Sequence, residues 1–425
     1  MKILLSAYAC EPNKGSEPGV GWHWAKEIAR LGHEVWVITR ANNQTVIEEA
    51  LAIAPNPNLH FAYYDLPGWL KRWKKMPGGV YLYYLLWQWG AYRLARSLTQ
   101  QISFDWVHHI TFGVLRMPSF MAFLDIPFIC GPLGGGEKAP EPLRSSFPLR
   151  GYLVDWLRDL SNNTIVINPL LRAMYRRSEI ILCKTAETKA AIPAIYQHKC
   201  RLYLEIGIEP NQQRLTASVK NSQEFKLLYV GRLVYWKGLH LGLQAFAQFH
   251  QQMPNSRLTV IGKGSDRLWM HHQAEELNID RAIDWIDWMP QQKVLQTYAQ
   301  YDAFLFPSLH DSSGNVVLEA LSHSLPVVCL DLGGPGAIVD NSCGRVIDTT
   351  DARPEIVVEK LNAALIELAS DRNLLQELKQ GAFKRSQTFH WHQLVKDFYT
   401  TLETPTRAVQ SRIETSLDLF VSNEQ

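Results

Sequence analysis

The chain has 425 residues, of which 46% are hydrophobic and 20% are charged, and its net charge is +2. These values are typical of a folded protein with two or three domains and argue against a disordered chain. Six cysteines are scattered without a CxxC pair, which argues against a disulfide framework or a zinc site and favours a reducing cytoplasm. The first residues are expected to form a strand with no signal peptide before it, and no run reaches the ~18 apolar residues of a membrane span.

The net charge hides a difference between the two halves of the chain. Residues 1–205 carry a balance of +7, whereas residues 206–425 carry −5. A basic first half predicts an anionic surface or an anionic acceptor on that side of the molecule.

Short apolar, β-rich runs alternate with amphipathic helical stretches, which predicts an α/β fold whose parallel sheets are built from βαβ units. In the first half we expect a helix at 20–30 and strands at 2–7, 34–39, 61–64, 105–110, 127–130 and 179–183. In the second half we expect strands at 227–230, 257–261, 283–285, 303–306, 327–330 and 345–347.

A polar, irregular stretch separates the two series of strands. We therefore predict a Rossmann-like first domain at 1–205, a linker at 206–224 and a Rossmann-like second domain at 225–390. A helical segment at 391–405 follows, and the polar tail 406–425 is expected to be mobile.

Two glycine-containing loops follow strands of the first half, at 14–21 and at 131–138. Small residues at the carboxyl ends of strands let a ligand approach the backbone. Glycine and proline mark most βα turns, however, and the second loop fits a flexible turn equally well. His108 and His109 end another strand, where side-chain alternation lets only one of them face a cleft. A packed histidine without a binding role fits this position as well.

Residues 68–96 mix basic and aromatic side chains. Lys71, Arg72, Lys74 and Lys75 alternate with tryptophans, and an apolar run rich in tyrosine and leucine follows. This composition is typical of a segment at the interface of an anionic bilayer, so 69–89 is a candidate peripheral membrane contact. A pair of helices packed on the first domain explains the same residues.

Two basic residues follow the strand expected at 227–230. They are Arg232 and Lys237, within the sequence GRLVYWKG at 231–238. Open parallel sheets bind ligands at the carboxyl ends of their strands, where a guanidinium and an ammonium group can neutralise a diphosphate. Taken alone, the motif also fits a solvated surface loop.

The most informative stretch is 307–328, in which Asp311 and Glu319 stand eight positions apart around a Ser/Gly turn. A helix is expected from Asn315, and the free N–H groups at its start would face a phosphate. Asp311 would then reach the group on one side of the phosphate and Glu319 the group on the other side. A sugar and a ribose in those places describe a nucleotide-sugar.

These motifs resemble the group 1 (glycosyltransferase family 4-like) retaining glycosyltransferases, which have the GT-B fold. The resemblance covers the C-terminal half and rests on GRLVYWKG at 231–238, VIGKGSD at 260–266 and PSLHDSSGNVVLEALSHSLPVV at 307–328. Asp311 stands where the family usually has glutamate, which bears on the sugar preference. Ser324 and Asp287 stand where it usually has glycine.

The resemblance implies two Rossmann-like domains across a cleft, with a C-terminal helix that crosses back to the first domain. It implies that Arg232 and Lys237 bind the donor diphosphate, Asp311 the sugar and Glu319 the ribose. It also implies that His108 or His109 contacts the sugar near its reacting centre, and that the backbone near 288–289 holds the base. The other donor contacts that it implies are Gly15, Ser16, Gly231, Gly262, Gly264, Gly314, Asn315 and Val316.

We therefore expect transfer of a hexosyl group from a nucleoside-diphosphate sugar to a hydroxyl of a glycan or lipid-linked glycan, with retention implied by the resemblance. The sequence has no DxD pair, so no metal or other cofactor is expected. No nucleic-acid partner is expected, and the location is the cytoplasm or the inner face of the membrane. The alternatives are a nucleotide-sugar epimerase of the same fold, which needs no acceptor, and a non-catalytic sugar-nucleotide-binding subunit.

Overall fold

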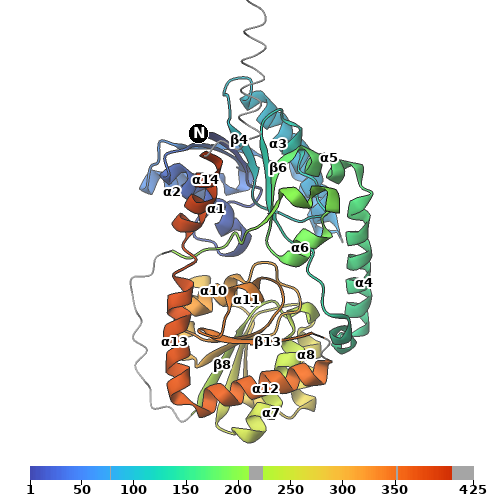
Figure 1. Cartoon of the computed structure of the whole chain (residues 1–425), viewed down its shortest axis with the longest axis vertical. Coiled ribbons are helices and arrows are strands. Elements are labelled where there is room, and N and C mark those ends of the chain that lie inside the picture. The colour runs from blue at the N-terminus through green and yellow to red at the C-terminus, as the bar shows by residue number, and fades with distance from the viewer. Residues whose placement is uncertain (77, 210–223, 351–352, 404–425) are drawn as a thin grey trace, which may run out of the picture.

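Two parallel sheets, each with helices packed on it, make up the computed structural model, which describes residues 1–76, 78–209, 224–350 and 353–403. The first sheet has 7 strands in the order β3-β2-β1-β4-β5-β6-β7, and the second has 6 in the order β10-β9-β8-β11-β12-β13. Figure 1 shows one sheet with its helices above the other. The predicted α/β class with two Rossmann-like sheets is confirmed.

The strands of the first sheet are β1 (Lys2–Ser6), β2 (Glu34–Arg40), β3 (Leu59–Tyr64), β4 (Trp106–His109), β5 (Phe128–Leu133), β6 (Ser178–Cys183) and β7 (Cys200–Leu202). Those of the second are β8 (Phe225–Val230), β9 (Ser256–Ile261), β10 (Ile283–Ile286), β11 (Ala303–Phe306), β12 (Val327–Leu330) and β13 (Gly344–Ile347). Every predicted strand is present. The edge strand β7 was not predicted, because its three residues form no apolar run.

The helices of the first half are α1 (Ser16–Arg30), α2 (Gln44–Ile53), α3 (Gly79–Leu98), α4 (Leu149–Asn163), α5 (Pro169–Arg177) and α6 (Ala186–Ala191). Those of the second half are α7 (Leu239–Gln252), α8 (Arg267–Glu276), α9 (Gln291–Thr297), α10 (Asn315–Ser322), α11 (Gly333–Ile338), α12 (Pro354–Ser370), α13 (Arg372–Ser386) and α14 (Trp391–Glu403). No helix in these described ranges has the length and apolar character needed to cross a membrane.

Helix α1 begins at Ser16, four residues before the predicted start at Val20, so the loop predicted to run to Gly21 ends at Gly15. Pro18 is compatible with the first turn, where the backbone N–H has no helical partner. The glycines allow close packing, since a Cβ atom on Gly21 would lie 2.1 Å from the carbonyl oxygen of Ala9.

Helix α14 returns to the first domain, as the family resemblance implied. It packs on α1, where Trp24 meets the rings of Phe398 and Tyr399, and Nδ1 of His392 lies 2.9 Å from the Glu27 carboxylate. Figure 1 shows α1 and α14 next to each other. The C-terminal segment therefore ties the second domain to the first.

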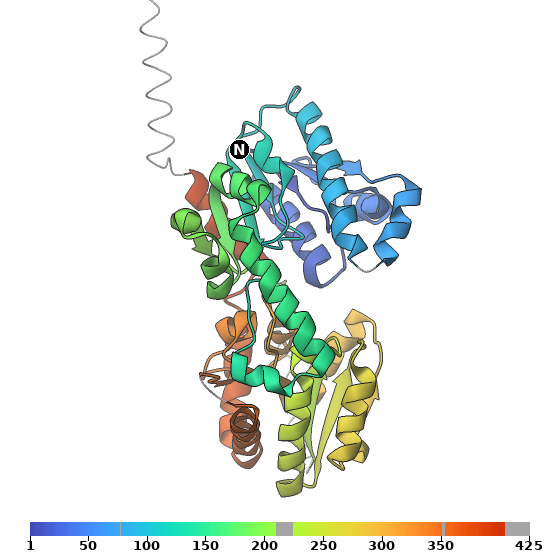
Figure 2. The ribbon, with the colours of Figure 1, turned by 90° about the vertical axis from the view of Figure 1, so that its right-hand side faces the viewer.

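Helix α4 runs between the two domains. Before it, the 3-10 turn η4 (Glu141–Ser146) and Phe147 reach the second domain, where Phe147 packs on Tyr235 with ring centroids 4.8 Å apart. Ser146 Oγ lies 2.8 Å from Nε2 of His240. Figure 2 shows α4 crossing the front of the molecule along its length.

Helix α3 packs Tyr84 and Trp87 into the core under the first sheet, as the packing alternative for 68–96 predicts, while Trp69 stays exposed. The side chains of 74 and 75 and residue 77 lie outside the described part. So do residues 210–223 of the predicted linker and the whole predicted tail 406–425, and the domain boundaries at 205 and 225 stay predictions.

Candidate functional site

The order of the second sheet reverses between β8 and β11, which pair directly. In open α/β sheets the loops after such neighbouring strands form the ligand crevice. The loop after β8 carries Arg232 and Lys237, and the loop after β11 carries Asp311. Backbone bonds join the two loops, because Leu309 and His310 both donate to the carbonyl of Trp236, at 2.9 and 3.2 Å. Folding therefore brings together the two motifs identified in the sequence.

Lys237 and Asp311 form an ion pair, with Nζ 2.5 Å from Oδ2. The other carboxylate oxygen accepts N–H bonds from Ser313 at 3.1 Å and Gly314 at 2.9 Å. Burial raises the pKa of the Asp311 carboxyl, but Lys237 and these N–H groups outweigh burial and hold the pKa below its usual value. Asp311 is thus an ionised acceptor, and a diphosphate bound to Lys237 would share the ammonium group with it.

Gly314 ends this turn in the left-handed conformation, with φ of 76°, and caps helix α10. A residue with a Cβ atom is strained there, which explains the glycine at the helix start. Asn315 and Val316 follow in the first turn, where helical N–H groups lack partners within the helix and favour an anion. Val316 is half-buried beside them.

Glu319 lies further along α10, and its carboxylate meets two neutral donors. Gln291 Nε2 donates to Oε1 at 3.1 Å, and the Tyr298 hydroxyl donates to Oε2 at 3.2 Å. Burial raises the pKa of the Glu319 carboxyl, and the two donors offset only part of that rise. The arrangement fixes both oxygens as acceptors one turn into α10.

Arg232 is exposed and its guanidinium lies 5.4 Å from the ring centre of Trp236. No carboxylate in the described part of the chain forms an ion pair with it, so its charge is available to an anionic ligand. Gly262 and Gly264 were expected to approach the donor. Added Cβ atoms there would lie 1.8 Å from the Gly231 carbonyl and 2.0 Å from that of Leu233. Close packing of the chain on itself already requires these glycines.

Gly15 of the first domain lies against the hydrogen-bonded group formed by Gln291 and Glu319. A Cβ atom there would lie 2.2 Å from Nε2 of Gln291, the group that donates to Glu319. Ser16 is exposed and has a φ of 57°, unusual for a residue other than glycine. The backbone at 288–289 was expected to hold the nucleotide base. The Trp288 side chain is exposed there, and the neighbouring Asp287 forms an ion pair with Arg267 at 2.8 Å.

The structure separates the two adjacent histidines. The Nε2–H of His108 donates to the Gly131 carbonyl at 2.8 Å, and its Nδ1 accepts from the Tyr399 hydroxyl at 2.8 Å. Both ring nitrogens are therefore used within the fold, on the side of α14 rather than toward a ligand. Burial lowers the pKa of His108 to about 4, and burial with the neighbouring His108 lowers that of His109 to about 3. Nε2 of His109 lies 3.3 Å from the Tyr84 hydroxyl. Because His108 is bound within the fold, His109 is the member of the pair that stays the candidate for the predicted sugar contact.

The glycine loop at 131–138 holds a residue that the sequence analysis did not single out. Glu137 is 3% exposed and accepts from Thr185 and Thr188, each at 2.8 Å. Ser312, next to Asp311, also donates to it at 2.8 Å across the domains. The loop therefore lines the crevice and is not a free turn. The sequence feature that could have pointed to Glu137 is its position directly after three glycines.

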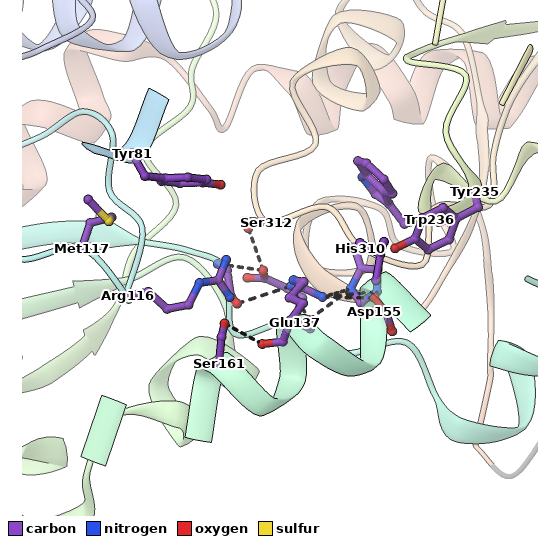
Figure 3. Close-up of a pocket in the computed structure, with 13 residues that line it drawn as sticks. Tyr81, Arg116, Met117, Glu137, Asp155, Ser161, Tyr235, Trp236, His310 and Ser312 are labelled. Carbon is purple, nitrogen blue, oxygen red and sulfur yellow. Dashed lines mark hydrogen bonds and ion pairs between the residues drawn. The ribbon is translucent and has the colours of Figure 1, made fainter. Parts of the chain in front are cut away.

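A cavity of about 670 Å³ adjoins the Lys237–Asp311 pair and lies between the domains. Figure 3 shows Arg116 and Tyr81 on one side, with Trp236 and His310 across from them. His310 Nε2 lies 2.9 Å from Asp155 of α4. Aromatic faces beside charged groups suit a polar, ring-shaped ligand. His310 was missed because its partner comes from α4, far away in the sequence.

In the described part of the chain, no group of three or more His, Cys, Asp or Glu residues could hold a metal ion. The donors gathered here are instead cations and N–H groups, which bind anions directly.

Residues 212–385 match the family model for "Glycosyl transferases group 1". A "Glycogen synthase" of Mycobacterium tuberculosis is 28% identical over 187 residues, 44% of this chain and 44% of the relative. A "D-inositol 3-phosphate glycosyltransferase" of Corynebacterium urealyticum is 28% identical over 211 residues, 46% of this chain and 48% of the relative. The chain thus spans less than half the length of these curated relatives.

Solved structures resemble the chain over nearly its whole length. WaaG, a glycosyltransferase involved in lipopolysaccharide biosynthesis, gives a TM-score of 0.59 at 17% identity and covers 95% of this chain and 100% of its own. Anabaena HepE in complex with UDP has a TM-score of 0.60 at 15% sequence identity and covers 95% of this chain and 100% of its own. At these identities the likeness shows the fold, which is GT-B.

Proposed function

We propose, on the premise that residues 212–385 belong to the group 1 glycosyl transferases, that this chain transfers a hexosyl group from a nucleoside-diphosphate sugar to an acceptor hydroxyl. The observation that carries the proposal is the arrangement around the start of α10. Asp311, paired with Lys237, precedes the free N–H groups of this helix along the chain, and Glu319 follows one helical turn after Asn315 with both oxygens held as acceptors. A sugar, a diphosphate and a ribose would meet these groups in that order.

Breaking the anomeric C–O bond leaves negative charge on the departing diphosphate. Arg232, Lys237 and the first N–H groups of α10 supply fixed positive potential for that charge. Asp311 would accept hydrogen bonds from the sugar hydroxyls, and Glu319 from those of the ribose. Retention at the anomeric carbon, which the family resemblance implies, is part of the proposal, as is deprotonation of the acceptor with help from the leaving phosphate.

The cavity beside Asp311 is our proposed acceptor site. Tyr81, Tyr235 and Trp236 offer ring faces, while Arg116 and Arg158 offer hydrogen-bond donors. A glycan or a lipid-linked glycan has the matching chemistry. The exposed Trp69 with the neighbouring basic side chains supports the proposed peripheral contact of 69–89 with anionic membrane. All six cysteines are free and buried, which supports a reducing, cytoplasmic setting.

The test is a screen of UDP-, GDP- and ADP-sugars with purified protein, by thermal shift and by hydrolysis. HepE is bound to UDP in its structure, so the UDP-sugars come first. We expect one donor to raise the melting temperature and to be hydrolysed slowly. Conversion of the donor to an epimer without acceptor would favour the epimerase, and binding without any turnover would favour the non-catalytic subunit. Stabilisation by none of the donors would overturn the site.

Independence from metal is part of the proposal and has its own test. The sequence has no DxD pair that would clamp a divalent ion on the diphosphate. We expect hydrolysis of the preferred donor to continue at an unchanged rate after treatment with EDTA. A loss of activity that Mg²⁺ or Mn²⁺ restores would contradict it.

A further inference from the structure

Helix α4 has its apolar side on the outside. Gly151, Asp155 and Asn162 are its buried residues, and they include no large apolar side chain. The opposite side of the helix is exposed and apolar, with Leu149 87% and Leu153 56% exposed. Tyr152, Trp156, Leu157 and Leu160 are exposed on the same side, whereas the exposed Val154 lines the cavity. This is the reverse of the pattern of a surface helix in a globular protein.

The exposed apolar surface continues past the end of α4. Val166, Ile167 and Leu170 are exposed in the turn and in the start of α5. Contiguous apolar patches of this kind are rare on monomers and mark contacts with proteins or membranes. We define the outer face of α4 as its six exposed apolar residues other than Val154, together with these three.

The exposed charged residues of α4 and α5 are all basic. Arg150, Arg172, Arg176 and Arg177 are exposed on α4 and α5. The acidic residues of α4, Asp155 and Asp159, pair with Arg144 at 3.4 and 2.5 Å, so neither offsets these arginines. Tryptophan and tyrosine among leucines, bordered by arginines, are the composition of a helix lying at an anionic bilayer interface.

We propose that the outer face of α4 docks on an anionic lipid surface, with the helix lying in the plane of the headgroups. The apolar side chains would enter the acyl boundary, and the arginines would meet the lipid phosphates. This contact is separate from the segment 69–89 and does not require a donor sugar. A bilayer accounts for both the apolar stripe and the basic border.

The placement has a consequence for the cavity. Asp155, Arg158 and Ser161 on the inner side of α4 line it, and Figure 3 shows the helix forming its wall. A helix with its side chains is about 10 Å across. A docked α4 would therefore hold the cavity within about one helix diameter of the lipid headgroups.

The experiment is co-sedimentation of the full chain with vesicles of phosphatidylcholine, with and without phosphatidylglycerol. We expect binding that increases with phosphatidylglycerol and weakens as salt screens the arginines. Leu153→Glu/Leu157→Glu should reduce the partition coefficient by about tenfold or more, because two charges replace apolar groups at the interface. The control is Ile53→Glu/Ile195→Glu, which changes two isoleucines elsewhere on the first domain that are more exposed than the two leucines and should leave binding unchanged.

A second measurement reports the position of the helix. Leu160→Cys carries an environment-sensitive dye, which is selective because the six native cysteines are buried. A blue shift on adding anionic vesicles supports docking. The proposal is overturned if Leu153→Glu/Leu157→Glu binds vesicles like the wild type. It is also overturned if only Lys71→Gln/Arg72→Gln abolishes binding, or if the wild type is a dimer that the α4 variant dissociates and that ignores vesicles. Circular dichroism melting of each variant confirms that it is folded.

Discussion

Lys237 links the two motifs of the candidate site, since it faces the diphosphate position and is also the partner of Asp311. Lys237→Ala should reduce donor turnover by about a hundredfold or more, the usual effect of removing one charge-stabilising group. It also leaves a buried carboxylate without its cation, which lowers the free energy of unfolding by about 3 kcal/mol. The measurement is kcat with the preferred donor, together with urea unfolding.

The control for this variant is Lys360→Ala, which removes another lysine–aspartate pair, with Asp348, on an exposed surface. It should change neither turnover nor the unfolding midpoint. Unchanged turnover in Lys237→Ala would remove the diphosphate role assigned to this loop.

The ionised Glu319 carboxylate lowers the free energy of unfolding, because it is buried with only two neutral hydrogen-bond donors. Its pKa is raised by burial from 4.5, so the folded state binds the proton more tightly than the unfolded chain. Stability therefore falls as pH rises from 4.5 through the folded pKa. Glu319→Gln should match or exceed the wild-type melting temperature near neutral pH, with the difference vanishing near pH 4.5. It should nevertheless bind the nucleotide about tenfold more weakly.

Thermal melting across pH, with and without the nucleotide, measures both effects of Glu319→Gln. The exposed Glu276→Gln on α8 serves as the control and should shift neither curve. A variant that is less stable at neutral pH and binds the nucleotide normally would show that Glu319 is a packing residue.

At the scale of elements, the docking of α14 sets the state of His108. Its folded pKa of about 4 lies below the ordinary 6.5 because the ring is buried. The unfolded chain therefore binds the proton more readily, and the stabilisation present above 6.5 is lost as pH falls through 4. When the pH is lowered from about 7.5 to about 5, the free energy of unfolding of the wild type should fall by about 2 kcal/mol more than that of His108→Gln.

Urea unfolding at the two pH values tests this difference, with the exposed His272→Gln as control. His109 and His240 have lowered pKa values as well, but they are present in both proteins and cancel in the comparison. Equal losses in the wild type and in His108→Gln would place the acid sensitivity elsewhere.

The elements also show what local sequence could and could not predict. The buried strands were found because parallel strands covered on both faces read as apolar runs. Helix α10 was found from the Ser/Gly turn before it. The early start of α1 was missed because Pro18 and Gly19 read as loop residues. Helix α4 was missed because its apolar stripe carries no information on whether it faces the core or the solvent.

The same limit applies within the site. Asp311 and Glu319 were predicted from their spacing, since both lie on one short stretch. Gln291, Tyr298 and Glu137 were not, because they reach the site from other segments of the chain, the start of α9, the turn after it and the 131–138 loop. The histidine pair was predicted only as a pair, and the orientation of His108 depends on Tyr399, almost 300 positions later.

At the scale of the whole molecule, the crevice is held by contacts from both domains around Lys184. Its Nζ lies 2.5 Å from Glu205 and 3.3 Å from the Ser313 hydroxyl of the second domain. Ser313 in turn donates to Glu205 at 2.7 Å. Burial lowers the pKa of Lys184, but Glu205 and Glu17 outweigh burial and hold it above the usual value. Lys184 is the cation that balances these carboxylates.

Lys184→Met should therefore lower the free energy of unfolding by about 3–5 kcal/mol at neutral pH, because buried carboxylates lose their cation. In the wild type the Lys184 contribution is fully present below the unfolded pKa of 10.5 and is lost as pH rises through the folded value. The pKa of the Glu17 carboxyl is already raised by burial and is opposed by Lys184, so it rises further in the variant and the deficit should shrink as pH falls toward 5. Lys184→Met/Glu205→Gln removes both charges and should recover part of the loss, which a double-mutant cycle measures. A deficit that is equal at pH 8 and pH 5, with no recovery in the double variant, would mean that Lys184 acts by packing and not by charge.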